Sequence, residues 1–362
     1  MRQLIMYFFR IEFLTLHDSE TRYYSAFLKL PKMKKLLSVL LCTSIVCNVL
    51  YGQSFYTNPL AHTYSIVARD SVTGEMGVAV QSHWFSVGSI VSWGEAGVGV
   101  VATQSFVNPA FGPDGLNLLK EGKSPEEAVK ILTDSDSGRD VRQLGILDMR
   151  GRAASYTGKN CIPDAGHFTE KDFSVQANLM MNDKVWPAMA KAFKKTKGPL
   201  AERMVAALEA AQHAGGDIRG KQSAAILVVK PVATGRIWED RYIDLRVEDH
   251  AEPIKELKRV LQIFRAYEHM NAGDLALEKN DMTKASKEYG LAESMFPGNA
   301  EMKFWHAITL VNKGKTKEAL PLFKKVFEMD SNWSLLISRL RKVAQLNCDD
   351  ETEKQILNTN KK

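Results

Sequence analysis

The chain has 362 residues, of which 45% are hydrophobic and 25% are charged. Its length is about twice that of a typical domain, and its composition excludes a single small module, a disordered chain and a multi-span membrane protein. The net charge is +6, but the first 52 residues carry 7 Lys and Arg against 3 Asp and Glu, which leaves 41 against 39 in the rest. A nucleic-acid partner is therefore not expected.

A short apolar run at 36–47 follows the basic pair Lys34 and Lys35, and Gly52 comes soon after it. A basic segment, a short apolar segment and a small residue near a cleavage point are typical of a secretory signal peptide. The run is short for a membrane span, although a buried or anchoring helix is the alternative interpretation. The sequence thus predicts an exported protein that is periplasmic or secreted.

The signal peptide divides the N-terminal region into three parts. Residues 33–52 form the predicted signal peptide, with Met33 as the start, and residues 1–32 are an upstream extension that need not be translated. Residues 53–62 are then a short N-terminal segment of the exported chain.

Alternating and apolar runs separated by turn residues begin at Thr63. Antiparallel strands are predicted at 63–69 and 76–82, and further strands near 97–104, 141–148, 152–157, 173–180, 221–230 and 241–247. Two helical regions are predicted between them, at roughly 112–133 and at roughly 182–214, where Gly198-Pro199 breaks the pattern. This order excludes a doubly wound parallel fold, and it predicts a layered α+β domain over 63–252.

Helical patterns alone continue beyond His250. The segments 266–299 and 300–333 are each 34 residues long, which is the period of the tetratricopeptide helix pair. Small, aromatic and proline residues occupy the matching positions of that repeat in the first copy, at Gly273, Ala285, Tyr289, Ala292 and Pro297, and in the second copy at Ala307, Ala319 and Phe323. The region 253–350 therefore resembles a pair of tetratricopeptide repeats with a terminal capping helix at 335–346.

Ordinary helical hairpins are the alternative interpretation of this region, since amphipathic helices imitate the repeat pattern easily. Two repeats are fewer than usually stand alone, so we expect them to pack on the first domain. They predict a protein or peptide partner, and a homo-oligomer is a further option. Residues 351–362 are predicted to be a polar tail.

Local motifs do not identify an active site. The sequence holds no GxSxG, HExxH, Walker or paired-cysteine motif, so no cofactor and no metal is predicted. Polar residues gather at strand ends and turns, at 81–84, 104–109, 215–220 and 221–223. By composition alone, each of these clusters is more typical of a satisfied turn than of a catalytic group.

Eight stretches resemble, in order, the family named domain of unknown function 1028. They are 63–70, 97–109, 112–116, 142–146, 156–158, 165–167, 215–225 and 244–247, and the resemblance covers about 62–260. It implies an N-terminal-nucleophile hydrolase-like fold with four layers, αββα. In that superfold the first residue of a strand is the nucleophile, and its own α-amine, which titrates near 8, serves as the base.

Thr63 is the position that matches this nucleophile. Candidates to hold an oxyanion are Gln104, Asn108, Asn178, Gln222 and Ser223. Arg69 and Arg219 are candidates to lower the pKa of the amine. Asp217 is a candidate to orient the amine, and Ser82 is the last residue of the candidate site. A Ser82–His83 proton-transfer pair is not expected, because adjacent strand residues point to opposite faces.

The position of the signal peptide conflicts with this role. Cleavage near Gly52 leaves residues 53–62 in front of Thr63, so that the Thr63 nitrogen would be an amide. Either a second or self-catalysed cut follows His62, or Thr63 is not a nucleophile of this type.

Two functions remain at this point. The first is an exported hydrolase of small amide or cyclic-amide substrates that carries a helical interaction module. The second is a non-catalytic envelope protein of the same fold that binds a small-molecule ligand and interacts through its repeats. The state of the Thr63 nitrogen distinguishes them.

Overall fold

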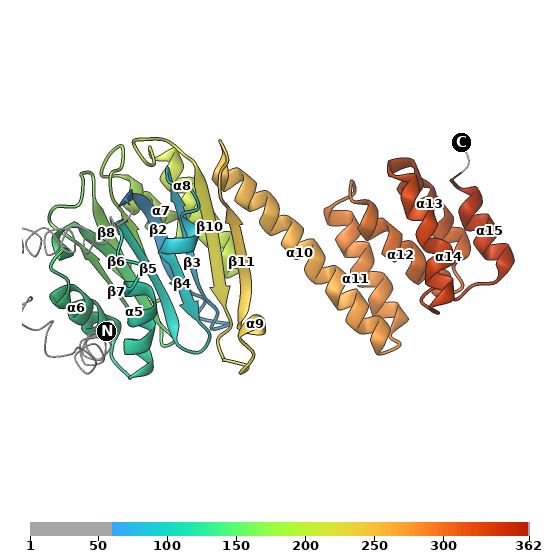
Figure 1. Ribbon diagram of the computed structural model, residues 1–362, viewed down its shortest axis with the longest axis horizontal. Coiled ribbons are helices and arrows are strands. Elements are labelled where there is room, and N and C mark those ends of the chain that lie inside the picture. Colours follow the sequence, from blue (N-terminus) through green and yellow to red (C-terminus); the bar gives the residue numbers. More distant parts are fainter. Residues whose placement is uncertain (1–59, 361–362) are drawn as a thin grey trace, which may run out of the picture. The chain divides into compact units, whose positions relative to one another are not determined.

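The computed structural model describes residues 60–360 (Figure 1). The predictions for the upstream extension, the signal peptide and most of the segment 53–62 lie outside these residues. Between residues 60 and 360, no helix has the length and apolar character that a membrane crossing requires.

Two antiparallel sheets form the first domain. In one sheet the order is β1 (Leu60–Ala61), β5 (Gly99–Phe106), β6 (Arg142–Asp148) and β7 (Ala153–Thr157), and β4 (Ser92–Glu95) also pairs with β5. In the other sheet the order is β11 (Arg241–Val247), β10 (Ser223–Val229), β3 (Met76–Ser82), β2 (Thr63–Arg69), β9 (Phe173–Ala177) and β8 (Gly166–Glu170). The predicted hairpin of 63–69 and 76–82 is present with the predicted bounds.

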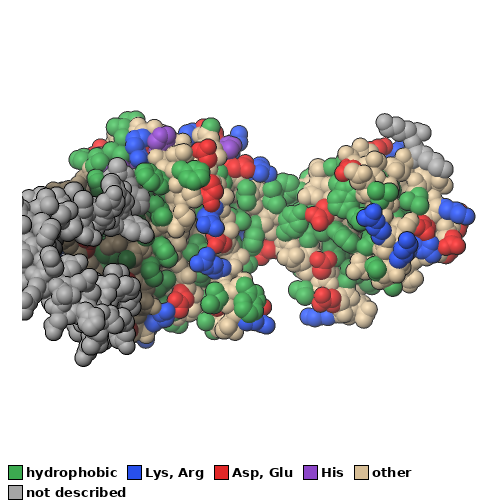
Figure 2. Space-filling model, viewed as in Figure 1, with side chains coloured by type: hydrophobic (Ala, Val, Ile, Leu, Met, Phe, Trp, Pro, Cys, Tyr) green, Lys and Arg blue, Asp and Glu red, His purple; other side chains and the backbone are tan. Residues whose placement is uncertain are grey.

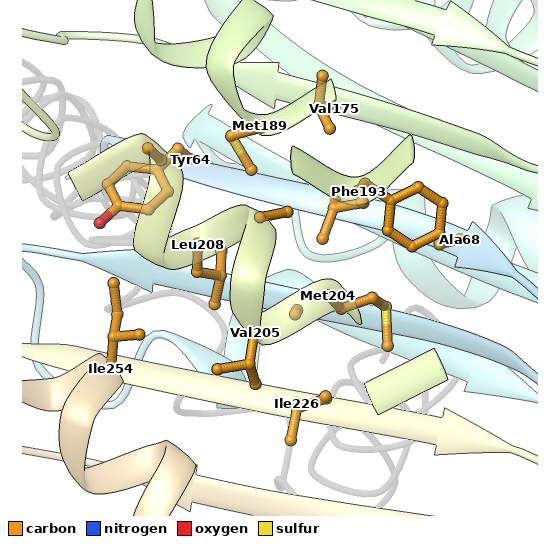
Figure 3. Close-up of a cluster of buried hydrophobic side chains, with 14 of the residues drawn as sticks. Tyr64, Ala68, Val175, Met189, Phe193, Met204, Val205, Leu208, Ile226 and Ile254 are labelled. Atoms are coloured by element: carbon orange, nitrogen blue, oxygen red, sulfur yellow. The ribbon is translucent and has the colours of Figure 1, made fainter. Parts of the chain in front are cut away.

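Helix pairs pack against the two sheets. Helices α5 (Phe111–Lys120) and α6 (Pro125–Ser135) share a buried cluster with β5 and β6, and α6 begins with the predicted capping box of Ser124 and Glu127. Helices α7 (Val185–Lys195) and α8 (Leu200–His213) share a cluster with the second sheet. Figure 3 shows Phe193, Met204 and Leu208 of these two helices among side chains of that sheet.

Strand alternation divides the second sheet into a helix-facing and a sheet-facing side. In β2, Tyr64 and Ile66 lie in the cluster with α7 and α8, whereas Val67 lies in the cluster between the sheets. Thr63 and Ser65 therefore face the first sheet, because alternate strand residues share a side. The N-terminal end of β2 thus directs hydroxyl groups into the interior of the sandwich.

Several short elements escaped the sequence analysis. They are β1, α4 (Gly88–Val91), β4, the 3-10 turns at Arg139–Val141 and Ser331–Trp333, β8 and α9 (Ile237–Asp240). Strand β8 is a sheet edge with four of its five residues exposed, so it lacks the apolar alternation that identifies a strand. Strand β9 ends at Ala177 rather than near 180, because Leu179 has a positive φ of 59°.

Ion pairs cover the opposite edge strand, β11. Figure 2 shows acidic and basic side chains together in this region, where Arg241 and Arg246 both pair with Asp244. Charges on an edge strand disfavour pairing with another sheet.

Six helices follow: α10 (Pro253–Glu278), α11 (Met282–Met295), α12 (Ala300–Asn312), α13 (Thr316–Met329), α14 (Ser334–Lys342) and α15 (Asp350–Asn358). Leu257 and Leu261 of α10 lie in the core with α7 and α8, while Ala266 and Met270 pack with α11. One helix therefore belongs to both domains. Each 34-residue segment holds two helical stretches, in agreement with the predicted helical region.

The segment 351–362 was expected to be a polar tail, but most of it is a helix. Residues Asp350–Asn358 form α15, in which Ile356 is fully buried. The guanidinium of Arg341 in α14 contacts the Glu353 carboxylate, and Ser338 donates to it at 2.6 Å. The charged residues of this segment conceal its single buried apolar position, which explains the error.

Candidate functional site

Thr63 begins β2 and is fully buried. It pairs with Ser82 of β3, and Ser82 pairs in turn with Ser223 of β10. The Thr63 hydroxyl donates to the carbonyl oxygen of Ala61 at 2.5 Å. The hydroxyl group therefore lies beside the peptide bonds that precede it.

Two side chains donate to the carbonyl oxygen of His62, the residue bonded to the Thr63 nitrogen. Ser82 Oγ lies 2.5 Å from this oxygen, and Arg219 Nη2 lies 2.7 Å from it. A hydroxyl and a cation on one carbonyl oxygen polarise the bond and stabilise the negative charge that develops when its carbon is attacked. The peptide bond between His62 and Thr63 thus has the surroundings of a reacting carbonyl.

Asp217 fixes the guanidinium of Arg219. Arg219 Nε lies 3.0 Å from Asp217 Oδ1, and Arg219 Nη2 lies 2.7 Å from Asp217 Oδ2. The same carboxylate, whose side chain is fully buried, accepts from the backbone N–H groups of Arg219 and His83. A bidentate pair of this kind sets both the direction and the charge of the donor.

Two amide side chains donate to the carbonyl oxygen of Thr63, and a third amide, that of Gln143, holds both of them. Gln104 Nε2 donates to this oxygen at 3.3 Å and Asn178 Nδ2 at 3.4 Å. The same two amides donate to Gln143 Oε1, at 2.7 and 2.9 Å. Gln143 Nε2 donates to the Ala177 carbonyl at 2.8 Å, so Gln143 orients both amides and is itself held by the backbone.

The polar layer continues along the strands. Ser65 Oγ donates to Gln104 at 2.6 Å and to Gln176 at 3.0 Å. Gln176 lies directly over Gly145, where a Cβ atom would come within 2.3 Å of Gln176 Nε2. A connected hydrogen-bond network therefore runs through this part of the interior, which a buried polar layer needs for stability.

The side chain of His62 is buried and contacts Asn178 and Phe106. Its Nδ1 lies 2.8 Å from Asn178 Oδ1, and its ring meets the Phe106 ring edge-on at 5.5 Å between centroids. Burial and the nearby Arg219 charge lower the pKa of His62, although the hydrogen bond to Asn178 opposes this effect. Burial thus favours the neutral ring.

The structure brings six of the ten predicted site residues together: Thr63, Ser82, Gln104, Asn178, Asp217 and Arg219. Their contacts differ from the expected ones. Arg219 contacts the carbonyl in front of Thr63, Asp217 holds Arg219, and Gln104 and Asn178 bind the carbonyl oxygen of Thr63 itself.

The other four predicted residues make contacts elsewhere. Arg69 lies at the far end of β2, about 20 Å along the strand, and pairs with Asp172 at 3.1 Å. Asn108 accepts from the Ala110 N–H, Gln222 donates to Asp249, and the Ser223 hydroxyl donates to the Trp84 carbonyl. This position corrects the prediction that Arg69 lowers the pKa of the Thr63 amine, because the two groups lie at opposite ends of β2.

Gln143, Ser65 and His62 are parts of the site that the sequence analysis missed. Gln143 is a polar residue in a strand that is buried along its whole length, next to the apolar run 144–147, and this contrast is the signal that could have identified it. Ser65 carries a weaker signal of the same kind. Nothing local marks His62, because its role depends on contacts with residues more than 100 positions away.

A cavity among the described residues lies at the other end of the sandwich. It has a volume of about 610 Å³, and its lining includes Trp93, Lys120 and Val229 but not Thr63. Val229 pairs with Met76, whereas Thr63 pairs with Ser82, so the cavity and Thr63 are at opposite strand ends. No group of three or more metal-ligating side chains occurs within residues 60–360.

Comparisons with known proteins agree with this organisation. The model of a family of unknown function, DUF1028, matches residues 63–257. The crystal structure of protein SPO2555 from Silicibacter pomeroyi, assigned to the same family, is 34% identical with a TM-score of 0.51, over 56% of this chain and 85% of that one. Anbu, an ancestral beta-subunit from Yersinia bercovieri, matches 56% of this chain and 97% of its own at 13% identity, with a TM-score of 0.28 that is too low to carry an argument. None of the curated proteins matches the chain.

Proposed function

The chain belongs to the DUF1028 family of unknown function, and on this premise we propose that it is an exported hydrolase of small amide or cyclic-amide substrates. The proposal assigns the two-sheet domain to the four-layer N-terminal-nucleophile type, with Thr63 as the nucleophile. The observation that carries it is the pair of donors, Ser82 and Arg219, on the carbonyl oxygen that precedes Thr63.

The proposed first reaction is a cut within the chain itself. The Thr63 hydroxyl attacks the carbonyl carbon of His62, and the negative charge on the oxygen is stabilised by Ser82 and Arg219. The bond from this carbon to the Thr63 nitrogen then breaks, the nitrogen takes up the hydroxyl proton, and an ester remains. Water hydrolyses this ester to give a carboxylate at His62 and a Thr63 with a free amine and a free hydroxyl.

The same groups then serve a separate substrate. The Thr63 amine, with an ordinary pKa near 8, accepts the hydroxyl proton as the oxygen attacks the substrate carbonyl. The proton passes to the leaving amine, and water releases the acyl group from Thr63. Asp217 is a positioning residue in this scheme, since its two oxygens hold the guanidinium of Arg219.

Access to Thr63 supports a cut before substrate binding. Thr63 is fully buried, and His62 above it is 3% exposed. A substrate carbonyl therefore reaches the hydroxyl only after the residues that precede Thr63 have left.

A binding protein without catalysis remains the second candidate. The observation that favours it is the pairing of β1 with β5 at Leu60–Phe106 and Ala61–Ser105, which holds the residues before Thr63 in the sheet. In this alternative a small molecule is the ligand, and its binding does not depend on the Thr63 hydroxyl.

The C-terminal helices are proposed to be tetratricopeptide-type repeats that bind a protein or peptide. Close contact between α10 and α11 supports this part, since a Cβ at Gly273 would come within 2.6 Å of the Tyr289 ring. A homo-oligomer formed through these helices is the other option for this region.

Substitution of Thr63 tests the function. Thr63→Ser keeps a hydroxyl and is expected to be cut and to hydrolyse amides, while Thr63→Ala is expected to do neither and to stay folded. Amide hydrolysis by purified protein is measured over a panel of linear and cyclic amides, with chain mass recorded in parallel. Equal hydrolysis by Thr63→Ala and the unaltered protein would contradict the proposal.

A further inference from the structure

Ala61 and His62 are buried directly before Thr63, and β1 pairs with the end of β5, so removal of these residues would open a cleft that leads to Thr63. Strand β4 covers the first half of the free edge of β5, from Gly99 to Ala102, and β1 covers its end, at Ser105 and Phe106. The other edge of β5 is paired with β6. Removal of β1 therefore leaves an open strand edge next to the nucleophile.

We propose that this cleft is the acyl-side substrate subsite, and that it takes an extended peptide whose reacting carbonyl belongs to a histidine. The inference rests on the proposed function, and it refines its substrate class from small amides to peptide amides. Residues 60–62, which we call the leader, would then mark where the acyl part of the substrate binds.

Backbone geometry favours an extended peptide. An exposed strand edge binds a peptide by adding it as a further strand, with main-chain hydrogen bonds that supply affinity. Ala61 pairs with Ser105, whose φ of 72° is rare for a residue with a side chain. Such backbone strain clusters at ligand-binding sites, where the surrounding structure maintains it.

Side-chain contacts favour histidine. Asn178 Nδ2 donates to Gln143 Oε1, so Asn178 Oδ1 faces His62 and accepts from its Nδ1. Gln143 in turn is fixed through its Nε2 by the Ala177 carbonyl, which prevents the Asn178 amide from turning to suit another partner. Phe106 contributes an edge-on aromatic contact to the same ring.

An aliphatic side chain loses these contacts. It would leave Asn178 Oδ1 buried without a donor, and an unpaired buried acceptor weakens binding by about tenfold or more. The pocket thus discriminates by hydrogen bonding as well as by size, which is the stronger form of discrimination.

The chain that begins at Thr63 is suited to a direct binding test. Among residues 60–360, the cluster between the second sheet and α7 and α8 has no member before Tyr64, and Ala61 is the one member of the cluster between the sheets that precedes Thr63. The two sheets therefore keep their cores without the leader.

The test compares two peptide acids on this one protein by titration calorimetry: acetyl-Leu-Ala-His and acetyl-Leu-Ala-Leu. Neither has an amide bond at its C-terminus to be cut, so the readout is binding alone. We expect the histidine peptide to bind at least tenfold more tightly. The uncut Thr63→Ala chain, in which residues 60–62 fill the cleft, is the matched control and should bind neither.

Substitution of Asn178 adds a second comparison. In the Thr63-initiated chain, Asn178→Leu should remove most of the preference for histidine, measured as the ratio of the two peptide affinities. Equal affinities for the two peptides on the folded, unaltered protein, or no binding of either, would overturn the inference. If the full-length chain never cuts itself but a chain produced to begin at Thr63 binds the histidine peptide preferentially, the proposed function is refuted and the subsite stands. If the full-length chain cuts itself but the chain that begins at Thr63 binds neither peptide, the subsite is refuted and the proposed function stands.

Discussion

The guanidinium of Arg219 donates to the carbonyl oxygen of His62, 157 positions earlier in the chain. Ser82 donates to the same oxygen from the neighbouring strand. Both side chains act on the peptide bond that the proposed mechanism breaks.

Loss of either donor should slow the cut after His62. We expect Ser82→Ala and Arg219→Ala each to reduce the rate about 100-fold, because one oxyanion donor contributes on that scale. The rate is followed as the appearance of the shorter chain by mass spectrometry. Arg236→Ala is the control, because the Arg236 side chain is exposed and pairs with Glu239. An equal rate in all three variants would contradict the role of the donors.

Gln143 should matter for stability as well as for orientation. Gln143→Leu leaves the amides of Gln104 and Asn178 with unpaired buried hydrogens, so we expect the free energy of unfolding to fall by about 2–4 kcal/mol. Urea unfolding measures this change. The exposed Gln355→Leu should stay within about 0.5 kcal/mol, and a similar small value for Gln143→Leu would show that the network does not depend on it.

Gly145 makes room for the Gln176 side chain. A methyl group there would lie 2.3 Å from Gln176 Nε2, and that amide is held by Ser174 at 2.7 Å. We expect Gly145→Ala to cost about 1–3 kcal/mol in thermal unfolding, as overpacking does elsewhere. Gly298→Ala, at a position with open space and without a positive φ, is the matched control, and equal melting temperatures would refute the close contact.

The leader's attachment should weaken in acid. The pKa of His62 is lowered from 6.5, so the unfolded or detached state binds the proton more readily. The contribution of His62 is therefore complete above pH 6.5 and is lost as the pH falls through the lower, folded pKa.

Melting temperatures between pH 5 and 8 test this effect in the uncut Thr63→Ala chain. Adding His62→Gln, which keeps a hydrogen-bond donor but does not titrate in this range, should reduce the loss of stability in acid. An identical acid loss with and without His62 would show that another group is responsible.

The main strands of the first domain could be predicted from the sequence because one rule governs them. Short runs rich in apolar and β-branched residues, bounded by turn residues, give β2 and β3 with their bounds, and the capping box gives the start of α6. Strand β1 has two residues and β8 is exposed at the sheet edge, so neither provides a pattern. Their positions depend on partners distant in the chain.

For the candidate site, the sequence predicts the identity of several residues but not their contacts. Thr63 and Arg219 lie in stretches that resemble the family, and they were chosen for their chemistry. Their contacts could not be predicted, because the direction of the Arg219 side chain depends on Asp217 and on the path of the chain through His62. Arg69 was assigned to the site by its charge alone, and the length of β2 places it at the other end.

The central claim is that the chain is cut between His62 and Thr63. Intact mass and N-terminal sequencing of protein from the exported fraction test it most directly. The account predicts a chain that begins at Thr63, with a free amine. A chain that begins near Gln53 and retains His62 in peptide linkage to Thr63 would contradict it and would favour the binding protein.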